Sequence, residues 1–523
     1  MIRVQLALVA AWACAQPLQA QGGSRLWRPE ERVVISDFSV VQALAVSEEL
    51  LYAATTGGLV IFDRRFGRWE PPVTGLDGYP PEPVRVALVD PVDRSVWLGT
   101  DQRLVHYVPT LRRFETIPVV GGVRGLMLDR RDPFAGMWVG TRAGWEFLPY
   151  GGIMLTTATR SPADPVRPLT VDAALARAPY LATRAADILT DERLRRYRYT
   201  AAALAPDTDE MFLGTDGLGL LQVDPGTTEA RRLAFGLLAP SASGVVAVPG
   251  GVWTGTPEGT SRAGFTFVGD DLQRFAYDEG PRGAGYAFRR VFDLAWSEGV
   301  LWAATDGGVV RRAGESPGEL LYRYEGVERD VVFALTKGGT GVWAGTQQGL
   351  VWVDDGGGVR RVDNPRVGPI LAVAASGDTL WIGGSRGLGV AWSGSDTIYV
   401  PRGTDRYPEL GNRIVAVAVL GDTLFAATAA RLLWRAPGEE WVVERPLGGD
   451  LGNVTVLLGD EGGVWVGGTN GLAFYRPRTR DFLLLNQPGD LPGMVRDMAA
   501  DATYLWVAAT GGLVRFEKEA LRR

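Results

Sequence analysis

Hydrophobic and polar positions repeat along the chain in one unit, seen clearly in Val342–Leu350, which reads Val-Trp-Ala-Gly-Thr-Gln-Gln-Gly-Leu. Aligned on its aromatic residue, the unit recurs eleven times, 38 to 49 residues apart with one gap of 74. The aromatic positions are Tyr52, Trp97, Trp138, Phe212, Trp253, Trp302, Trp343, Trp381, Phe425, Trp465 and Trp506. An apolar residue precedes each aromatic, and Gly or Ala follows two residues later. Period two places the aromatic and the small residue on one face of a strand, where sheets pack closely.

Each unit continues through a turn into a second apolar run. Thr stands three residues after the aromatic in eight copies, and Gly stands six residues after it in eight. Gly accepts positive φ, so Thr-x-x-Gly predicts a tight hairpin. Short runs upstream, such as Val84–Val89, and downstream, such as Arg113–Thr116, bring each repeat to about four antiparallel strands.

Four strands in each repeat of about 40 residues predict an all-β fold, a β-propeller of eleven blades. A repetitive sandwich or a β-solenoid is the alternative. Eleven repeats exceed the usual four to eight blades, so we expect two rings, such as rings of five and six blades or rings that include a degenerate twelfth blade. One ring could also be inserted within the other. One large ring is the alternative. The lone strand Arg32–Ser36 can complete the last blade, which ends at Glu517 without a fourth strand.

The gap of 74 residues holds a segment of different character, at about 160–196. It is rich in Ala, Leu and Arg and is broken at Pro179, which predicts two short helices, Val171–Ala178 and Ala182–Arg196. A degenerate blade is the alternative.

The first 20 residues predict a secretory signal peptide. Arg3 gives a positive start, Val4–Ala15 is apolar except for Gln5, and Ala20 is a small residue at the cleavage point. We therefore expect a mature propeller region of residues 21–523, periplasmic or extracellular and without a membrane span. The single cysteine, Cys14, lies in the leader, and acylation there would make an outer-membrane lipoprotein instead. A net charge of −6, with dispersed Arg, argues against a nucleic-acid partner.

The units Val342–Leu350 and Val464–Leu472 resemble two-component-regulator propeller repeats, in which an apolar residue and Trp lead through Gly-Thr to Gly-Leu. The resemblance covers nearly all of the expected mature chain. It implies an exported bacterial propeller, similar either to sensor ectodomains that bind glycans or other extracellular ligands or to proteins of cell-surface machinery. The sequence ends at Arg523 without the kinase of the sensors, and the shared motif carries over neither catalytic residues nor a ligand site.

Candidate chemistry is sparse. The only histidine, His106, has no second histidine with which to form a multi-histidine metal site. The acidic groups Asp129–Asp132, Asp207–Glu210 and Asp354–Asp355 could hold Ca²⁺ through their oxygens, although Asp also favours turns. We otherwise expect no cofactor.

The function expected is that of a non-catalytic binding or scaffold protein that recognises a glycan or a cell-envelope protein. A propeller lyase or hydrolase acting on glycans or peptides is the alternative. Two hairpins carry Arg in place of the turn Gly, Arg103 and Arg431. Arg suits carboxylates and planar groups, so we expect these two residues and the helical segment to mark the binding face. The other hypothesis for the helical segment is that it only caps a ring or fills a cleft between rings.

Overall fold

The computed structural model of the protein describes residues 26–523, except 225, 315, 323–330 and 363–365. The expected leader, residues 1–20, and Cys14 lie outside the described residues. Over the described part of the chain, no helix has the length and apolar character needed to cross a membrane.

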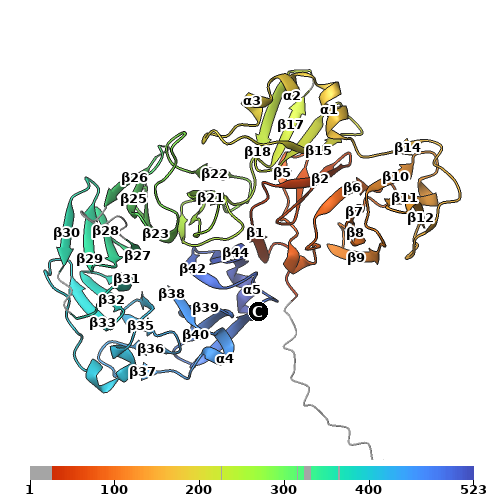
Figure 1. The fold of residues 1–523 in the computed structure, drawn as a ribbon. Helices are drawn as coiled ribbons and strands as arrows, with labels where there is room; N and C mark the ends of the chain where they lie inside the picture. The colour runs from red at the N-terminus through yellow and green to blue at the C-terminus, as the bar shows by residue number, and fades with distance from the viewer. Residues whose placement is uncertain (1–25, 225, 315, 323–330, 363–365) are drawn as a thin grey trace, which may run out of the picture.

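The predicted β-propeller fold is confirmed. The described strands form eleven antiparallel sheets, called here blades 1 to 11 in chain order (Figure 1). Every repeat aromatic lies in the second strand of its blade, and nine of the eleven are buried, all but Trp97 and Trp381. The repeat therefore corresponds to the blade, and its aromatic to the centre of the blade core.

Blades 1 to 4 form one unit, the four-blade arc. Blade 1 holds β2 (Val41–Val46), β3 (Leu50–Thr55), β4 (Leu59–Asp63) and β5 (Arg68–Trp69), and blade 2 holds β6 (Val84–Val89), β7 (Val96–Thr100), β8 (Arg103–Val108) and β9 (Arg113–Pro118). Blade 3 holds β10 (Gly125–Asp129), β11 (Gly136–Thr141), β12 (Gly144–Pro149), β13 (Thr156–Thr157) and β14 (Pro165–Val166), and blade 4 holds β15 (Tyr199–Leu204), β16 (Met211–Thr215), β17 (Leu220–Asp224) and β18 (Glu229–Leu233).

Blades 5 to 11 form the second unit, the seven-blade ring. Blade 5 holds β19 (Val245–Val248), β20 (Gly251–Gly255), β21 (Phe265–Gly269) and β22 (Phe275–Asp278). Blade 6 holds β23 (Val291–Ser297), β24 (Val300–Thr305), β25 (Gly308–Ala313) and β26 (Glu319–Tyr322). Blade 7 holds β27 (Val332–Gly338), β28 (Gly341–Thr346), β29 (Leu350–Asp354) and β30 (Val359–Val362). Blades 8 and 9 hold β31 (Ile370–Ser376), β32 (Thr379–Gly384), β33 (Gly387–Trp392); and β34 (Ala416–Leu420), β35 (Thr423–Ala427), β36 (Leu432–Arg435), β37 (Val442–Val443). Blade 10 holds β38 (Val454–Asp460), β39 (Gly463–Gly468), β40 (Gly471–Arg476) and β41 (Asp481–Asn486). Blade 11 holds β42 (Val495–Ala500), β43 (Tyr504–Ala509) and β44 (Gly512–Glu517), and its fourth strand is β1 (Arg32–Ile35).

Short helices lie outside the blades. They are α1 (Val171–Arg177), α2 (Tyr180–Thr183), α3 (Ala185–Ile188), α4 (Gly448–Leu451) and α5 (Lys518–Arg522), with 3₁₀ turns at Gly75–Asp77, Pro133–Ala135, Thr404–Arg406 and Pro408–Gly411.

The small residue of the repeat sets how blades pack. A Cβ added to Gly99 in blade 2 would lie 2.4 Å from a methyl group of Val123, which leads into blade 3. In blade 4, a Cβ on Gly214 would lie 2.4 Å from Val41 of blade 1. Blade 4 therefore packs against blade 1 and not against blade 5. The arc therefore runs 4-1-2-3. Gly140 in blade 3 faces only its own blade, where Trp145 covers it and stays 44% exposed at the end of the arc.

The lone N-terminal strand closes the ring, as predicted. β1 pairs antiparallel with β44, with Arg32 opposite Phe516 and Ile35 opposite Leu513. The inner strands β19, β23, β27, β31, β34, β38 and β42 then pack side by side, and β42 returns to β19. The four-blade arc is inserted between β1 and β19. The suggested split into rings of five and six blades is thus wrong. The described blades form one closed ring of seven and an open arc of four, which ends where Trp145 covers Gly140.

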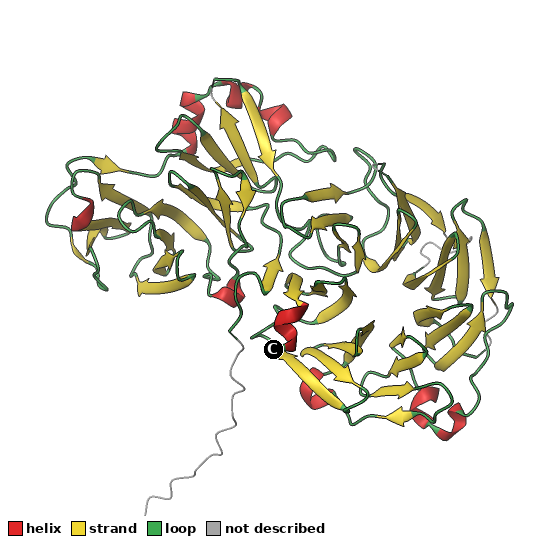
Figure 2. Ribbon diagram, turned by 180° about the vertical axis from the view of Figure 1, so that it is seen from behind, coloured by secondary structure: helices red, strands yellow, loops and turns green. Residues whose placement is uncertain are grey.

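The helical segment caps the arc. Residues of β16 alternate between two cores: Phe212 packs toward blade 1, whereas Met211 and Leu213 pack against α1 to α3 through Ala174, Leu181 and Leu189. Figure 2 shows these helices beside blade 4. The second predicted helix is split and ends at Ile188 instead of Arg196. The reason is local: Asp191 accepts the backbone N–H groups of Arg193 and Arg195 in a turn, and Leu194 is left-handed.

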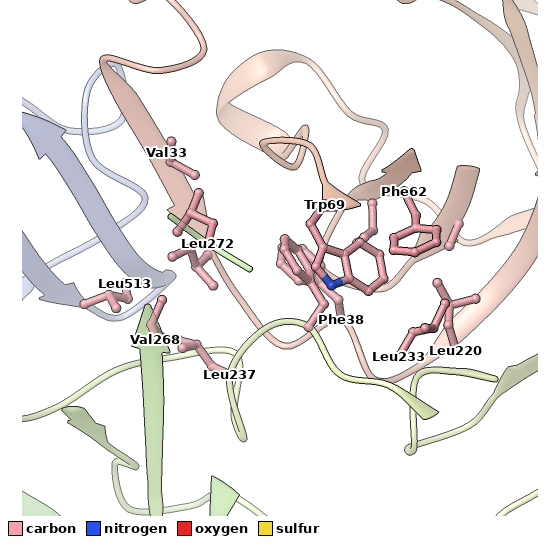
Figure 3. Close-up of a cluster of buried hydrophobic side chains, with 14 of the residues drawn as sticks. Val33, Phe38, Phe62, Trp69, Leu220, Leu233, Leu237, Val268, Leu272 and Leu513 are labelled. Carbon is pink, nitrogen blue, oxygen red and sulfur yellow. The ribbon is translucent and has the colours of Figure 1, made fainter. Parts of the chain in front are cut away.

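One hydrophobic cluster joins the two units (Figure 3). Phe38, Trp69 and Leu233 come from the arc side, and Val268, Leu272 and Leu513 come from the ring. Trp69 lies 4.5 Å from Phe235 between ring centroids, in the link from blade 4 to blade 5. The junction is therefore a packed core, and it fixes the walls of the cavities that lie over it.

Candidate binding site between the arc and the ring

The two predicted binding arginines do not share a site. Arg103 belongs to blade 2 and Arg431 leads into β36 of blade 9, on separate units (Figure 1). The Arg103 guanidinium pairs with Glu82 at 2.5 Å, and Arg431 donates to the carbonyl of Glu444 at 3.2 Å. Their backbone N–H groups donate to Thr100 and Thr428, as turn Gly does elsewhere. Each arginine therefore has a local structural partner, and their binding role stays a prediction.

His106 lies next to a serine, but this serine is inaccessible. The imidazole Nε2 lies 2.7 Å from Ser95 Oγ, and the ring stacks on Trp97 at 4.0 Å. Its Nδ1 is 3.9 Å from Glu115. Burial lowers the pKa of His106 despite the neighbouring carboxylates, which would raise it. Ser95 is only 1% exposed, so a substrate cannot reach its hydroxyl as it would a catalytic nucleophile.

The three acidic groups proposed for Ca²⁺ take part in turns and ion pairs. Asp207 and Glu210 bind the buried Arg64 of blade 1 at 2.9 and 3.0 Å. Asp129 accepts the N–H groups of residues 163 and 164, and Asp354 accepts those of Gly356 and Gly358. In the described part of the chain, no group of three or more His, Cys, Asp or Glu is placed to hold a metal.

The concave surface with the most suitable side chains is the junction itself. A cavity of about 440 Å³ lies between Trp69 of β5, the end of β18 and the strands β21 and β22. Its aromatic lining is Phe62, Trp69, Phe267 and Phe275, and its charged lining is Arg231, Arg232 and Arg274. Arg274 lies over the Phe267 ring at 5.8 Å. This half of the site therefore offers apolar ring faces beside cations.

A second cavity, of about 570 Å³, continues on the other side of Arg232, Phe275 and Ala276, which line both. Its far wall is the segment from Arg184 to Arg193, which ends the helical cap, and its floor includes Tyr277 and Glu279. The guanidinium of Arg232 lies 5.4 Å from the Tyr277 ring centre. The two cavities together are named the junction groove.

A charged network holds the cap against the ring at one end of the groove. Arg195 binds Asp191 and, across the junction, Glu279, both at 2.6 Å. Arg262 binds the other oxygen of Glu279 at 2.5 Å. Burial alone would raise the pKa of Asp191, but hydrogen bonds from Arg195 and from the Tyr197 hydroxyl outweigh it and lower the pKa. These groups are mutually neutralised, so they act as a rigid wall.

Arg232 is the arginine that lines both cavities of the junction groove. Its side chain is exposed, and its guanidinium lies beside the Tyr277 ring. Arg presents several donors in a fixed plane, which suits carboxylates and hydroxyl-rich ligands, and aromatic faces suit the apolar faces of rings. The groove was missed from sequence because its residues lie outside the repeat motif. The alternation Phe275-Ala276-Tyr277 in an outer strand was the one available signal.

Comparisons by sequence give no relatives: no protein-family model matches the chain, and no curated protein matches it. Comparison by structure is informative. PorZ, an essential surface component of the type-IX secretion system of Porphyromonas gingivalis, aligns with 93% of this chain and 87% of its own. The identity is 11% and the TM-score is 0.53, which shows a shared propeller fold and agrees with the resemblance drawn from the repeats.

Two other structures are less similar. The extracellular domain of the hybrid two-component system protein BT3049 of B. thetaiotaomicron covers 92% of this chain and 82% of its own, with 14% identity and a TM-score of 0.45. Virginiamycin B lyase of Staphylococcus aureus covers 53% of this chain and 94% of its own, with 14% identity and a TM-score of 0.43.

Proposed function

We propose that this protein is an exported, non-catalytic binding protein whose junction groove recognises a glycan of the cell envelope or its surroundings. The observation that carries the proposal is the groove itself: Arg232 and Phe275 are shared by two adjoining cavities where the arc meets the ring. Cavities of 440 and 570 Å³ fall in the range of small-molecule sites, roughly 300–1,000 Å³, and junctions between domains are favoured places for them.

The chemistry of the lining suits sugars. A pyranose ring has an apolar face and an edge of hydroxyl groups, so it needs a flat apolar partner and several donors. Phe275 and Phe267 are half-buried and offer the former, while Arg232 and Arg274 offer the latter. Strands form most of the walls of the first cavity, and the junction core fixes their positions. Binding would therefore cost little ordering of the protein.

Export rests on separate support. The first 20 residues have the composition of a secretory leader, and PorZ, which shares the fold, is described as a surface component. Both observations support a periplasmic or extracellular location. The lipoprotein alternative depends on Cys14 and is tested by mass spectrometry of the mature N-terminus.

A glycan array probed with purified residues 21–523 tests the proposal. Wild-type protein should bind a defined set of glycans, and Arg232→Met and Phe275→Ala should each lose that binding. Arg232→Met should melt as wild type does, whereas Phe275→Ala should melt lower but stay folded, because the Phe275 ring packs on Phe235 at 4.8 Å between centroids. The matched control is Arg113→Met, because Arg113 is also an exposed arginine on the fourth strand of a blade. Unaltered glycan binding by both groove variants would contradict the site.

The same preparation tests the alternative partner and the alternative activity. Capture of an envelope protein through the groove, with no glycan bound, would replace the glycan by a protein partner. Release of new reducing ends or peptide fragments by the wild-type protein would show the propeller enzyme instead.

A further inference from the structure

The seven-blade ring encloses a central cavity of about 450 Å³, lined by the inner strands of all seven blades. These strands run in the same direction around the ring, so their first residues surround one mouth of the cavity. Two arginines come from this level: Arg496 is the second residue of β42, and Arg290 directly precedes β23. β19 is the only inner strand between β42 and β23 in the described ring.

β-bulges bring the side chains to the mouth. The register of β42 against β43 shifts between Val495 and Asp497, which leaves Arg496 as the extra residue. The same shift in β23 leaves Phe292, and in β27 it leaves Phe333. Bulges redirect side chains, and the same shift recurs in β2, β6, β15, β31 and β38, so it belongs to the repeat and does not by itself mark a site. Arg496, Phe292 and Phe333 all line the cavity.

The two arginines lack an acidic partner. Neither forms an ion pair within 4.0 Å with any described carboxylate, and the Nε atom of each is buried without a hydrogen bond there. Burial, and then the neighbouring charge of Arg290, lowers the pKa of Arg496. Both side chains are half-buried, and two neighbouring cations in a partly desolvated site are costly unless an anion is present.

A third unpaired group lies at the start of the strand between them. Ser243, two residues before β19, is 3% exposed, and its hydroxyl has no hydrogen-bond partner in the described structure. Buried polar atoms without partners are rare in folded proteins, and the Arg290 Nε, Arg496 Nε and Ser243 Oγ atoms lie on adjoining strands at one level, which points to a polar ligand there. The nearby Asp293 and Asp497 are already engaged, because each accepts backbone N–H groups from its own and the next inner strand.

An aromatic wall adjoins the cations. The Arg290 guanidinium lies 4.3 Å from the centre of the Phe292 ring, and Phe292 meets Phe333 edge to face at 5.4 Å. We propose that this mouth is a binding site for an oxyanion, a carboxylate or a phosphate, carried by a ligand whose apolar part rests on Phe292 and Phe333. The site is separate from the junction groove, and its test does not depend on that groove.

Calorimetric titration of residues 21–523 tests the site with benzoate, phenyl phosphate and the neutral control benzyl alcohol at constant ionic strength. The two anions should bind and benzyl alcohol should not, and the tighter anion identifies the headgroup. Arg496→Met and Arg290→Met should each weaken anion binding about ten-fold or more, as loss of a charged hydrogen bond does. Arg435→Met is the matched control, because Arg435 is half-buried and stacked on Trp441 in blade 9.

The wild-type protein can refute the proposal without any variant. Equal affinity for benzyl alcohol and benzoate would overturn it, as would heat signals absent for both anions. Among the variants, unchanged affinity in both Arg496→Met and Arg290→Met would overturn it too. Melting temperatures check folding, and Arg496→Met should melt no lower than wild type, because it removes a half-buried charge that has no acidic partner in the described structure.

Discussion

Trp69 and Gln273 lie 204 residues apart in sequence but are hydrogen-bonded like residues of adjacent strands. The Gln273 side chain accepts the backbone N–H of Trp69 at 2.7 Å and donates to its carbonyl at 2.9 Å. One side chain thus satisfies both backbone hydrogen-bonding groups of Trp69, which lies in the edge strand β5 of the arc. It also fastens the arc to blade 5 of the ring, in the wall of the junction groove.

Replacing Gln273 should weaken this junction. Gln273→Ala leaves the two backbone groups of Trp69 without their partner, and we expect a loss of about 1–3 kcal/mol in unfolding free energy. Urea denaturation followed by Trp fluorescence measures it. Gln102→Ala, at an exposed turn of blade 2, is the control and should change stability little. Equal stability of the two variants would mean that the bonds to Trp69 contribute nothing.

The helical cap should be structural. Leu181 in α2 is fully buried against blade 4, and Leu181→Ala should destabilise the protein by about 2–5 kcal/mol, as for other core leucines. Replacing Pro165–Arg195 by a short Gly-Ser bridge should expose Met211 and Leu213 and cause loss of the fold or aggregation. If the variant with the Gly-Ser bridge melts at the wild-type temperature, the cap is not needed for stability. If that folded variant has also lost ligand binding, the cap is a recognition element.

Strand β1 should determine closure of the ring. A chain that begins at Asp37 lacks β1, which leaves β44 as an open edge and uncovers part of the core around Phe516. We expect a much lower melting temperature and self-association by light scattering, in comparison with a chain that begins at Gln21. A monomer with unchanged melting would show that the ring is stable without β1.

His106 should make stability depend on pH. Its folded-state pKa is below the ordinary value near 6.5, so the unfolded chain binds the proton more tightly. Its contribution therefore falls as pH drops through 6.5 toward the folded pKa. His106→Gln should lose less stability than wild type between about pH 7 and pH 5. If urea unfolding shows that the two proteins lose the same unfolding free energy across this pH range, His106 is not the source of the pH dependence.

Local features of the chain were predictable from sequence, and packing between blades was not. The blades and the β1 closure follow from strands adjacent in sequence or from an obvious spare strand. The order 4-1-2-3 was hidden because Gly214 is the same kind of residue as Gly99, yet it receives Val41 from a blade far earlier in the chain. The apolar run Met211-Phe212-Leu213 did signal two covered faces, but not that helices cover one.

The site was harder to predict for the same reason. Arg103 and Arg431 stood out as exceptions to the turn pattern, but each serves its own blade through a neighbouring group. Arg232 and Phe275 break no pattern, and they come together only because the arc docks on the ring. Sites formed between units depend on contacts that a repeat period does not encode.

The most direct test of the account is amide hydrogen exchange of residues 21–523 with and without the glycan selected on the array. The account predicts slower exchange in β18, β22 and the segment 184–193, which are opposite walls of the junction groove. Protection confined to the hairpins at Arg103 or Arg431, with these three segments unchanged, would contradict it.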